Sequence, residues 1–191
     1  LLPHVTHAYR KDTMIWESFY WKSDLLKQAE ALMKRTAQKR WPDASFARCE
    51  QTIMLGFYSI RKLTESGKLT DQVANLKVRV RSHPWKGRVV HCMNSHKLDE
   101  LYDWDISDER SVPLSFLYNQ VIHSYAFSLL LGEDGGLHGI LVTSDQRRCK
   151  ELFEVSIEQI IGVFRSVGND DVCSMEGRFD ETKGDYIFSR K

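Results

Sequence analysis

Residues 127–144 read FSLLLGEDGGLHGILVTS, and this stretch predicts β-structure in the second half of the chain. Two β-prone runs flank the glycine-rich segment GEDGG, which is the pattern of a β-hairpin. Upstream, LKVRVR at 76–81 alternates apolar with basic residues, as a strand with one basic face does. RVVHC at 88–92 and CKELFEV at 149–155 are candidates for further short strands. We therefore expect strands as well as helices.

The first third of the chain has helical periodicity. Residues 12–40 contain no glycine or proline, and Asp12 is a candidate N-cap for a helix that ends before Pro42. A second helix is expected over 44–66, where Gly67 provides a stop signal. The short loop between two such helices favours antiparallel packing.

Two more helices are expected after the basic strand. One covers 112–127, with Pro113 tolerated in its first turn. The other begins at the capping-box spacing of Ser156 and Gln159. The apolar face of this last helix consists of Ile157, Ile160, Ile161 and Phe164. The predicted fold class is α+β and mainly helical, with a long two-helix hairpin, two further core helices and a small antiparallel β-sheet or hairpins.

The length of 191 residues indicates one domain over 1–191, because one hydrophobic core commonly serves about 100 to 200 residues. Its expected parts are the helical hairpin 12–66, a strand-containing insert 76–110, a helix, hairpin and last helix over 112–168, and a polar tail 169–191.

Composition argues against a large net charge and against a membrane-spanning protein. The 27 Lys and Arg nearly balance the 26 Asp and Glu, so a polyanion site would have to be a local patch. No apolar run approaches the roughly 18 residues of a membrane span, and the first residues lack the apolar core of a signal peptide. The 4 cysteines form no CxxC pair, which favours reduced thiols. We expect a cytoplasmic protein without membrane contact and without a cofactor.

The stretch SFLYNQVIHSYAF at 115–127 places Asn119 and His123 in an otherwise apolar and aromatic run. On a helix these residues are four apart and project from one face. A buried amide and a buried imidazole need hydrogen-bond partners. The pair therefore either fixes how helices pack or belongs to a ligand site.

The NQVIH element, in a helix that follows a helical hairpin, resembles the HEPN superfamily of small helical domains in prokaryotic toxin, defence and RNA-processing proteins. Its motif is Arg, four to six residues and then His, often with a polar residue directly after the Arg. The resemblance implies a metal-independent ribonuclease with His123 and Asn119 as catalytic residues, at a site that is often completed by dimerisation. Tyr118 stands where the Arg belongs, so Arg110, or Arg61 and Lys62 on the second helix, would have to supply the cation.

The basic strand offers a second kind of site. Lys77, Arg79 and Arg81, followed by Trp85 and Arg88, combine phosphate-binding charge with an aromatic platform for a base. We take these five residues as candidates for nucleic-acid binding. The alternatives are an edge strand whose charges prevent edge-to-edge pairing, and a strand whose charges pair with the acidic segment 99–109.

A metal site is not predicted. His91, Cys92 and His96 are close in sequence, but a structural zinc site needs four ligands at defined spacings, and His4 and His7 are far from them.

Two functions remain open. The first is an RNA-associated, HEPN-like protein of prokaryotic defence or toxin type with a degenerate catalytic motif, acting as a possible homodimer. The second is a non-catalytic module that binds a protein partner.

Overall fold

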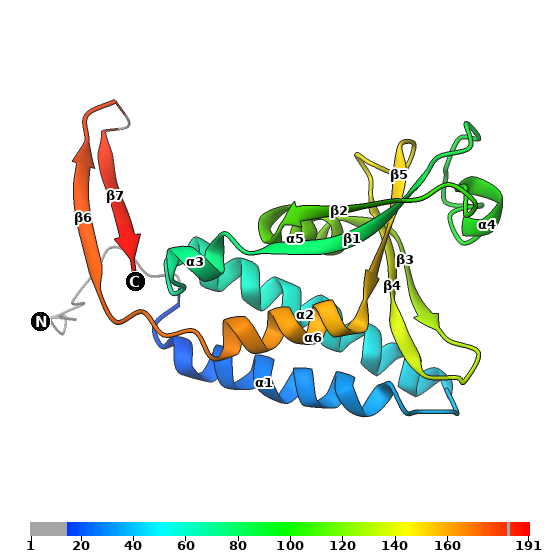
Figure 1. The fold of residues 1–191 in the computed structure, drawn as a ribbon, viewed down its shortest axis with the longest axis horizontal. Helices are drawn as coiled ribbons and strands as arrows, with labels where there is room; N and C mark the ends of the chain where they lie inside the picture. Colours follow the sequence, from blue (N-terminus) through cyan, green and yellow to red (C-terminus); the bar gives the residue numbers. More distant parts are fainter. Residues whose placement is uncertain (1–14, 183) are drawn as a thin grey trace, which may run out of the picture.

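The computed structural model describes residues 15–182 and 184–191, and Figure 1 shows its ribbon. Within these residues the chain forms six helices and seven strands. The helices are α1 Ser18–Arg35, α2 Asp43–Glu65, α3 Asp71–Ala74, α4 Leu98–Leu101, α5 Leu114–Ile122 and α6 Ile157–Gly168. The strands are β1 Lys77–Pro84, β2 Asp108–Pro113, β3 Ser124–Leu131, β4 Leu137–Ser144, β5 Glu151–Ser156, β6 Met175–Asp180 and β7 Asp185–Arg190. The fold class is α+β, as expected.

Five of the strands form one antiparallel sheet in the order β2-β1-β5-β4-β3, and β6 and β7 form a separate hairpin. β3 and β4 are the predicted hairpin, whose pairing starts at Ser124 opposite Ser144. Its turn needs glycine, because Gly135 has a φ of 83°. Trp41, between α1 and α2, donates from Nε1 to the carbonyl oxygen of Gly135 at 2.7 Å. The hairpin turn is thereby fastened to the helices.

Four helices, α1, α2, α5 and α6, lie on one face of the sheet in two tiers. α5 and α6 pack directly on the strands, and α1 and α2 pack on these two helices (Figure 1). Val142 of β4 and Phe153 of β5 are fully buried in this core. Phe57 of α2 meets Phe164 of α6 edge to face, with ring centroids 5.5 Å apart, and both are fully buried. Burial of these apolar surfaces is the main stabilising contribution to the fold.

The opposite face of the sheet is covered where β3, β4 and β5 meet. A second buried cluster there consists of Val90, Leu98, Leu101, Tyr102, Ala126, Leu141 and Leu152. The hydroxyl of Tyr102 donates to the carbonyl oxygen of Arg148 at 2.7 Å, and burial raises the pKa of this tyrosine to about 12. β4 therefore has two buried faces, and β3 at the edge of the sheet is at least partly buried at every position, which explains the nearly continuous apolar sequence of this region.

The expectation of a mainly helical fold is wrong, because the six helices are accompanied by a five-stranded antiparallel sheet and a second sheet of two strands. β2 has no recognisable strand pattern, since five of its six residues are exposed and no apolar alternation remains. The predicted helix over 112–127 also ends early: α5 stops at Ile122 and β3 begins at Ser124. A continuous apolar run fits a strand buried on both faces as well as a buried helix.

Other local expectations are confirmed. α2 matches the predicted second helix, and Ser156 caps α6 by accepting a hydrogen bond from the backbone N–H of Gln159 at 3.3 Å. Asp12, the expected cap of the first helix, lies outside the described residues, and the cap of α1 is Glu17. Residues 88–92 form no strand.

Two glycines give a matched test of this packing. A Cβ at Gly56 of α2 would overlap the ring of buried Phe164, whereas a Cβ at Gly162 of α6 meets nothing within 4 Å. We expect Gly56→Ala to destabilise the fold by about 1–3 kcal/mol through overpacking, despite alanine's higher helix propensity. Gly162→Ala should stabilise it by about 0.5–1 kcal/mol. Urea unfolding at unchanged m-value measures both, and equal effects of the two changes would contradict the close contact between α2 and α6.

Candidate functional site

A polar pocket of about 520 Å³ opens where the C-terminal end of α5 meets α2 and the segment after β4. We call it the Arg61 pocket. Its lining residues are Arg61, Asn119, Gln120, His123, Ser144, Asp145 and Gln146. They come from three elements that are far apart in sequence, so only the folded chain assembles them.

The backbone at the end of α5 holds the pocket together. His123 is the C-cap of α5, and its N–H donates to the carbonyl oxygen of Asn119 at 3.1 Å. The carbonyl oxygen of His123 accepts from the N–H of Asp145 at 3.3 Å. The buried Gln120 side chain accepts from the N–H of Ser144, also at 3.3 Å. The end of the helix and the segment after β4 are therefore joined by two hydrogen bonds.

Arg61 contacts His123 directly. The guanidinium Nη1 lies 3.2 Å from the imidazole Nε2. Arginine can only donate, so this hydrogen bond requires that Nε2 be the unprotonated acceptor nitrogen and that the neutral ring carry its proton on Nδ1. His123 is exposed, so Nε2 is a basic nitrogen beside a fixed positive charge and within reach of solvent.

Glu65 holds Arg61 in place from one turn further along α2. Its Oε1 accepts from Arg61 Nε at 2.6 Å, and its Oε2 accepts from Lys62 Nζ at 2.9 Å. The hydrogen bond from Arg61, followed by that from Lys62, keeps the pKa of Glu65 below its ordinary value, and Glu65 in turn raises the pKa of Arg61. The Nε of Arg61 is thus occupied by Glu65, while its Nη1 contacts His123 in the pocket.

Asn119 and Gln120 have opposite environments. Asn119 is exposed and lines the pocket with His123, whereas Gln120 is buried. Tyr118, at the position of the missing Arg, is also buried, and this burial, together with Glu65, raises its pKa. The buried polar residue of this helix is therefore Gln120, and the two candidates from the sequence face solvent.

No family model, no curated protein and no solved structure matches the chain.

Four pocket residues were missed in the sequence: Gln120, Ser144, Asp145 and Gln146. Gln120 could have been found, because it lies three residues after Leu117 on the apolar face of α5. Ser144 is the last residue of β4, and Asp145 and Gln146 directly follow it. The sequence contains no signal that this strand ends beside α5. Arg110 is not at the site, since on β2 it donates to Glu151 at 2.5 Å.

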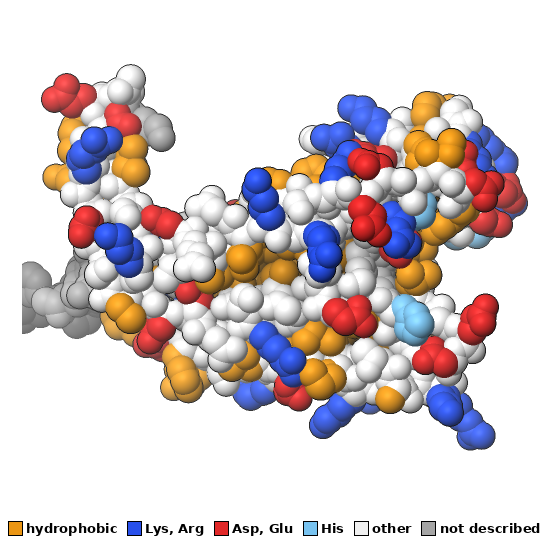
Figure 2. Space-filling model, in the orientation of Figure 1, with side chains coloured by type: hydrophobic (Ala, Val, Ile, Leu, Met, Phe, Trp, Pro, Cys, Tyr) orange, Lys and Arg blue, Asp and Glu red, His pale blue; other side chains and the backbone are white. Residues whose placement is uncertain are grey.

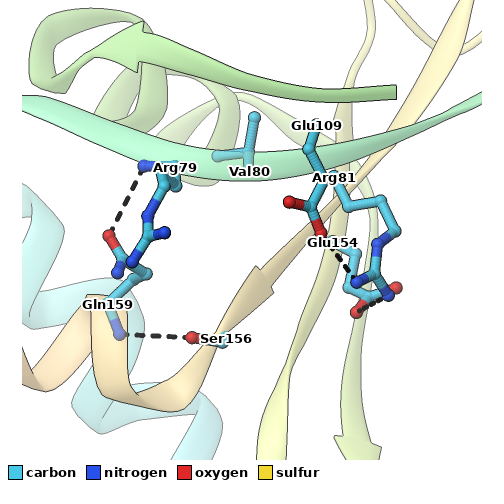
Figure 3. A pocket seen from close by; sticks show the side chains of 7 residues that line it. All are labelled: Arg79, Val80, Arg81, Glu109, Glu154, Ser156 and Gln159. Atoms are coloured by element: carbon cyan, nitrogen blue, oxygen red, sulfur yellow. Dashed lines mark hydrogen bonds and ion pairs between the residues drawn. The ribbon is translucent and has the colours of Figure 1, made fainter. Parts of the chain in front are cut away.

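The basic row on β1 is partly neutralised. Arg81 pairs with Glu109 at 2.9 Å and with Glu154 at 3.2 Å, as Figure 3 shows, and Arg88 pairs with Glu100. Glu100 and Glu109 belong to the acidic segment, as one alternative expected. The other alternative holds only for part of β1. The strand lies between β2 and β5, but β5 pairs only with residues 81–84, so in the described structure the stretch with Lys77 and Arg79 has a strand partner on one side.

The remaining candidates of this row differ in their contacts: Trp85 is partly buried, whereas Lys77 and Arg79 are exposed. Trp85 is partly buried against the second cluster and donates from Nε1 to the carbonyl oxygen of Arg88 at 2.6 Å. Lys77 and Arg79 are exposed, and neither makes an ion pair within the described part of the chain. In Figure 3 the Arg79 side chain lies beside Gln159 in a second, smaller hollow of about 170 Å³. None of these residues lines the Arg61 pocket.

Metal ligands do not gather in the described residues, where no group of three or more His, Cys, Asp or Glu is placed to hold an ion. His91 uses Nδ1 to accept from the N–H of Met93 at 3.2 Å. His4 and His7 lie outside the described residues. Among the helices that the structure describes, none has the length and apolar character to cross a bilayer.

Substitutions of Gln120 and His123, at the end of α5, distinguish a residue that stabilises the fold from one that does not. Gln120→Ala removes a buried acceptor and leaves the N–H of Ser144 unpaired, so we expect a loss of about 1–3 kcal/mol in the free energy of unfolding. His123→Ala changes an exposed side chain and should cost no more than about 0.5 kcal/mol. Chemical denaturation of both variants measures this; a large loss for His123→Ala would show that its imidazole is a packing element.

Proposed function

We propose that the Arg61 pocket binds a phosphodiester of RNA and cleaves it without a metal ion. The contact between Arg61 Nη1 and His123 Nε2 carries this proposal, since it joins a permanent cation and a basic nitrogen in an open pocket. Metal-independent RNA cleavage needs a group that takes the 2′-hydroxyl proton and positive charge beside the phosphorane.

The reaction assigns each residue a role. His123 Nε2 takes the proton of the 2′-hydroxyl, whose oxygen attacks phosphorus while the bond to the 5′ oxygen breaks. Arg61 turns from His123 to the phosphate oxygens and stabilises their developing charge. The leaving oxygen takes its proton from solvent. The products are a 2′,3′-cyclic phosphate and a free 5′-hydroxyl, and Asn119 supplies an amide that hydrogen-bonds the substrate.

Arg61 supplies what the HEPN-like motif lacks. The motif expects its cation at position 118, where this chain has a buried tyrosine, and α2 brings Arg61 to the same pocket as Asn119 and His123. The proposed activity rests on these side chains and does not require the helical fold of that superfamily. The resemblance would make the protein a ribonuclease of prokaryotic defence or toxin type.

Cleavage of a labelled single-stranded RNA in excess EDTA tests the proposal. We expect Arg61→Ala and His123→Ala each to lower the rate by about 10²–10⁴-fold, because each removes a group that acts in the transition state. Arg48→Ala is the matched control, since it removes an exposed cation of α2 that does not line the pocket and whose side chain, in the described structure, makes no hydrogen bond or ion pair with Glu65 or Arg61. A 2′-deoxy linkage at the cleaved position should resist the enzyme.

Two outcomes would contradict the proposal. One is the absence of cleavage and of RNA binding with well-folded protein across a pool of random RNA sequences. The other is cleavage that survives both Arg61→Ala and His123→Ala.

Exposed aromatic side chains favour a second function, a non-catalytic module that binds a protein partner. Trp16, Phe19 and Tyr20 at the start of α1 are exposed by 84%, 65% and 68%. Exposed apolar clusters of this kind commonly mark interaction surfaces. The second function would apply if the protein does not cleave RNA and if the change Phe19→Ser abolishes its binding to a protein partner.

In the RNA proposal, Lys77 and Arg79 lie outside the Arg61 pocket and are cations that guide the RNA strand. Replacing both with alanine should weaken RNA binding and reduce the salt dependence of log K by about 0.7 per lost phosphate contact. Fluorescence anisotropy at several salt concentrations measures the slope. Arg88→Ala is the control, because Arg88 already pairs with Glu100, and an equal change in slope for this variant would refute the role of Lys77 and Arg79.

A further inference from the structure

The β6–β7 hairpin stands apart from the rest of the fold. It projects beyond α3, at the upper left of Figure 1, and within the described residues β6 pairs with β7 alone. A two-stranded ribbon by itself is marginally stable in water, and three or more strands are generally needed. The hairpin therefore has the form of a sheet that a further strand would complete.

The backbone shows which groups of β6 are directed outward. Ser174 N–H donates to the carbonyl oxygen of Lys191 at 2.9 Å, and Lys191 N–H donates back to Ser174 at 3.0 Å. In an antiparallel pair such hydrogen-bonded positions alternate with positions whose groups point away from the partner strand. The N–H and C=O groups of Met175, Gly177 and Phe179 therefore point away from β7.

At its last residue, Arg190, the corresponding edge of β7 is held by the body of the protein. The N–H of Arg190 donates to Asp71 Oδ2 of α3 at 3.0 Å, and its guanidinium lies 3.9 Å from the same carboxylate. β7 is thus the inner strand, and β6 presents the open edge.

The side chains of β6 alternate between an apolar and a charged face. Met175 and Phe179 are exposed by 60% and 50% on one face, where Phe179 meets Tyr186 edge to face at 5.2 Å. Glu176 and Arg178 are exposed on the other face. Figure 2 shows the resulting mixture of hydrophobic, basic and acidic side chains along the projecting hairpin.

We propose that β6 pairs antiparallel with β6 of a second copy of this chain, about a twofold axis at Gly177. The outward backbone groups then bond to the same groups of the second copy. Met175 faces Phe179 of the second copy on the apolar face, and Glu176 faces Arg178 of the second copy on the charged face. Both relations occur twice by symmetry, so the dimer carries two cross-strand ion pairs and a continuous four-stranded sheet.

The charges of Glu176 and Arg178 favour this register over the other twofold registers of β6. A twofold axis at Glu176 or at Arg178 would place a like charge opposite itself, which destabilises a strand pair. An axis at Phe179 would align only the last part of the strand. With the axis at Gly177, Met175 to Phe179 are all paired, and Glu176 and Arg178 each face the opposite charge. Asp180, the last residue of β6, lies opposite the uncharged Ser174. The strand is thus complementary to itself, which favours a second copy over an unrelated strand.

The interface is small compared with the roughly 1,600 Å² of a stable complex, so we expect a dimer with a Kd of about 10–100 µM. Sedimentation velocity of the whole chain across that concentration range measures it. Glu176→Arg and Arg178→Glu should each weaken the dimer by about tenfold or more, since each turns two attractive pairs into repulsive ones. Glu50→Arg, an exposed change of the same kind on α2, should leave Kd unchanged.

Combining the two changes gives the decisive result. The doubly exchanged variant Glu176→Arg with Arg178→Glu should recover the dimer, and an equimolar mixture of the two single variants should form a heterodimer. A chain that is monomeric at about 500 µM would overturn the proposal, as would a dimer that none of these changes affects. Failure of the exchange to restore association would also overturn it. Circular dichroism confirms that each variant is folded, and these results are independent of any RNA cleavage.

Discussion

The antiparallel pairing that opens with Ser124 opposite Ser144 is the contact on which the rest of the structure depends. It ends α5 at Ile122 and turns the chain at once into the sheet. Because β3 and β4 then run together to a turn fastened by Trp41, the hairpin extends from the end of α5 to the loop between α1 and α2. β5 and β1 extend the same sheet, and α5 and α6 pack on it.

Burial of the sheet on both faces follows from this arrangement. The helices cover one face, and the cluster around Tyr102 covers the other. Strands with two buried faces need apolar residues at successive positions, and such a run has no period of two. This is the physical reason that the apolar segment 115–131 resembles a helix over more residues than it forms. An alternation of apolar and polar residues was clear only in β1, where one face is charged.

The same pairing produces the polar pocket. The last turn of α5 and the first residues after β4 meet side by side, with hydrogen bonds between their backbones and from Gln120. The pocket thus has a rigid wall, and α2 adds Arg61 from the other side, oriented by Glu65. In the proposed function, an arginine that is held at its Nε would lose little conformational entropy on binding a phosphate.

The sequence by itself determined the local features. Helix α2, the cap of α6, the β3–β4 hairpin and the strand at 77–81 follow from periodicity, capping residues and turn glycines, which act within a few residues. It also indicated that a catalytic site at Asn119 and His123 would need a cation such as Arg61 close to them. Tertiary structure alone decided that β2 pairs with β1, that the sheet organises the fold, and that Arg61 and Asp145 reach the end of α5. Those outcomes depend on strand partners and helix packing between distant segments, and exposed polar residues such as those of β2 carry no pattern that specifies them.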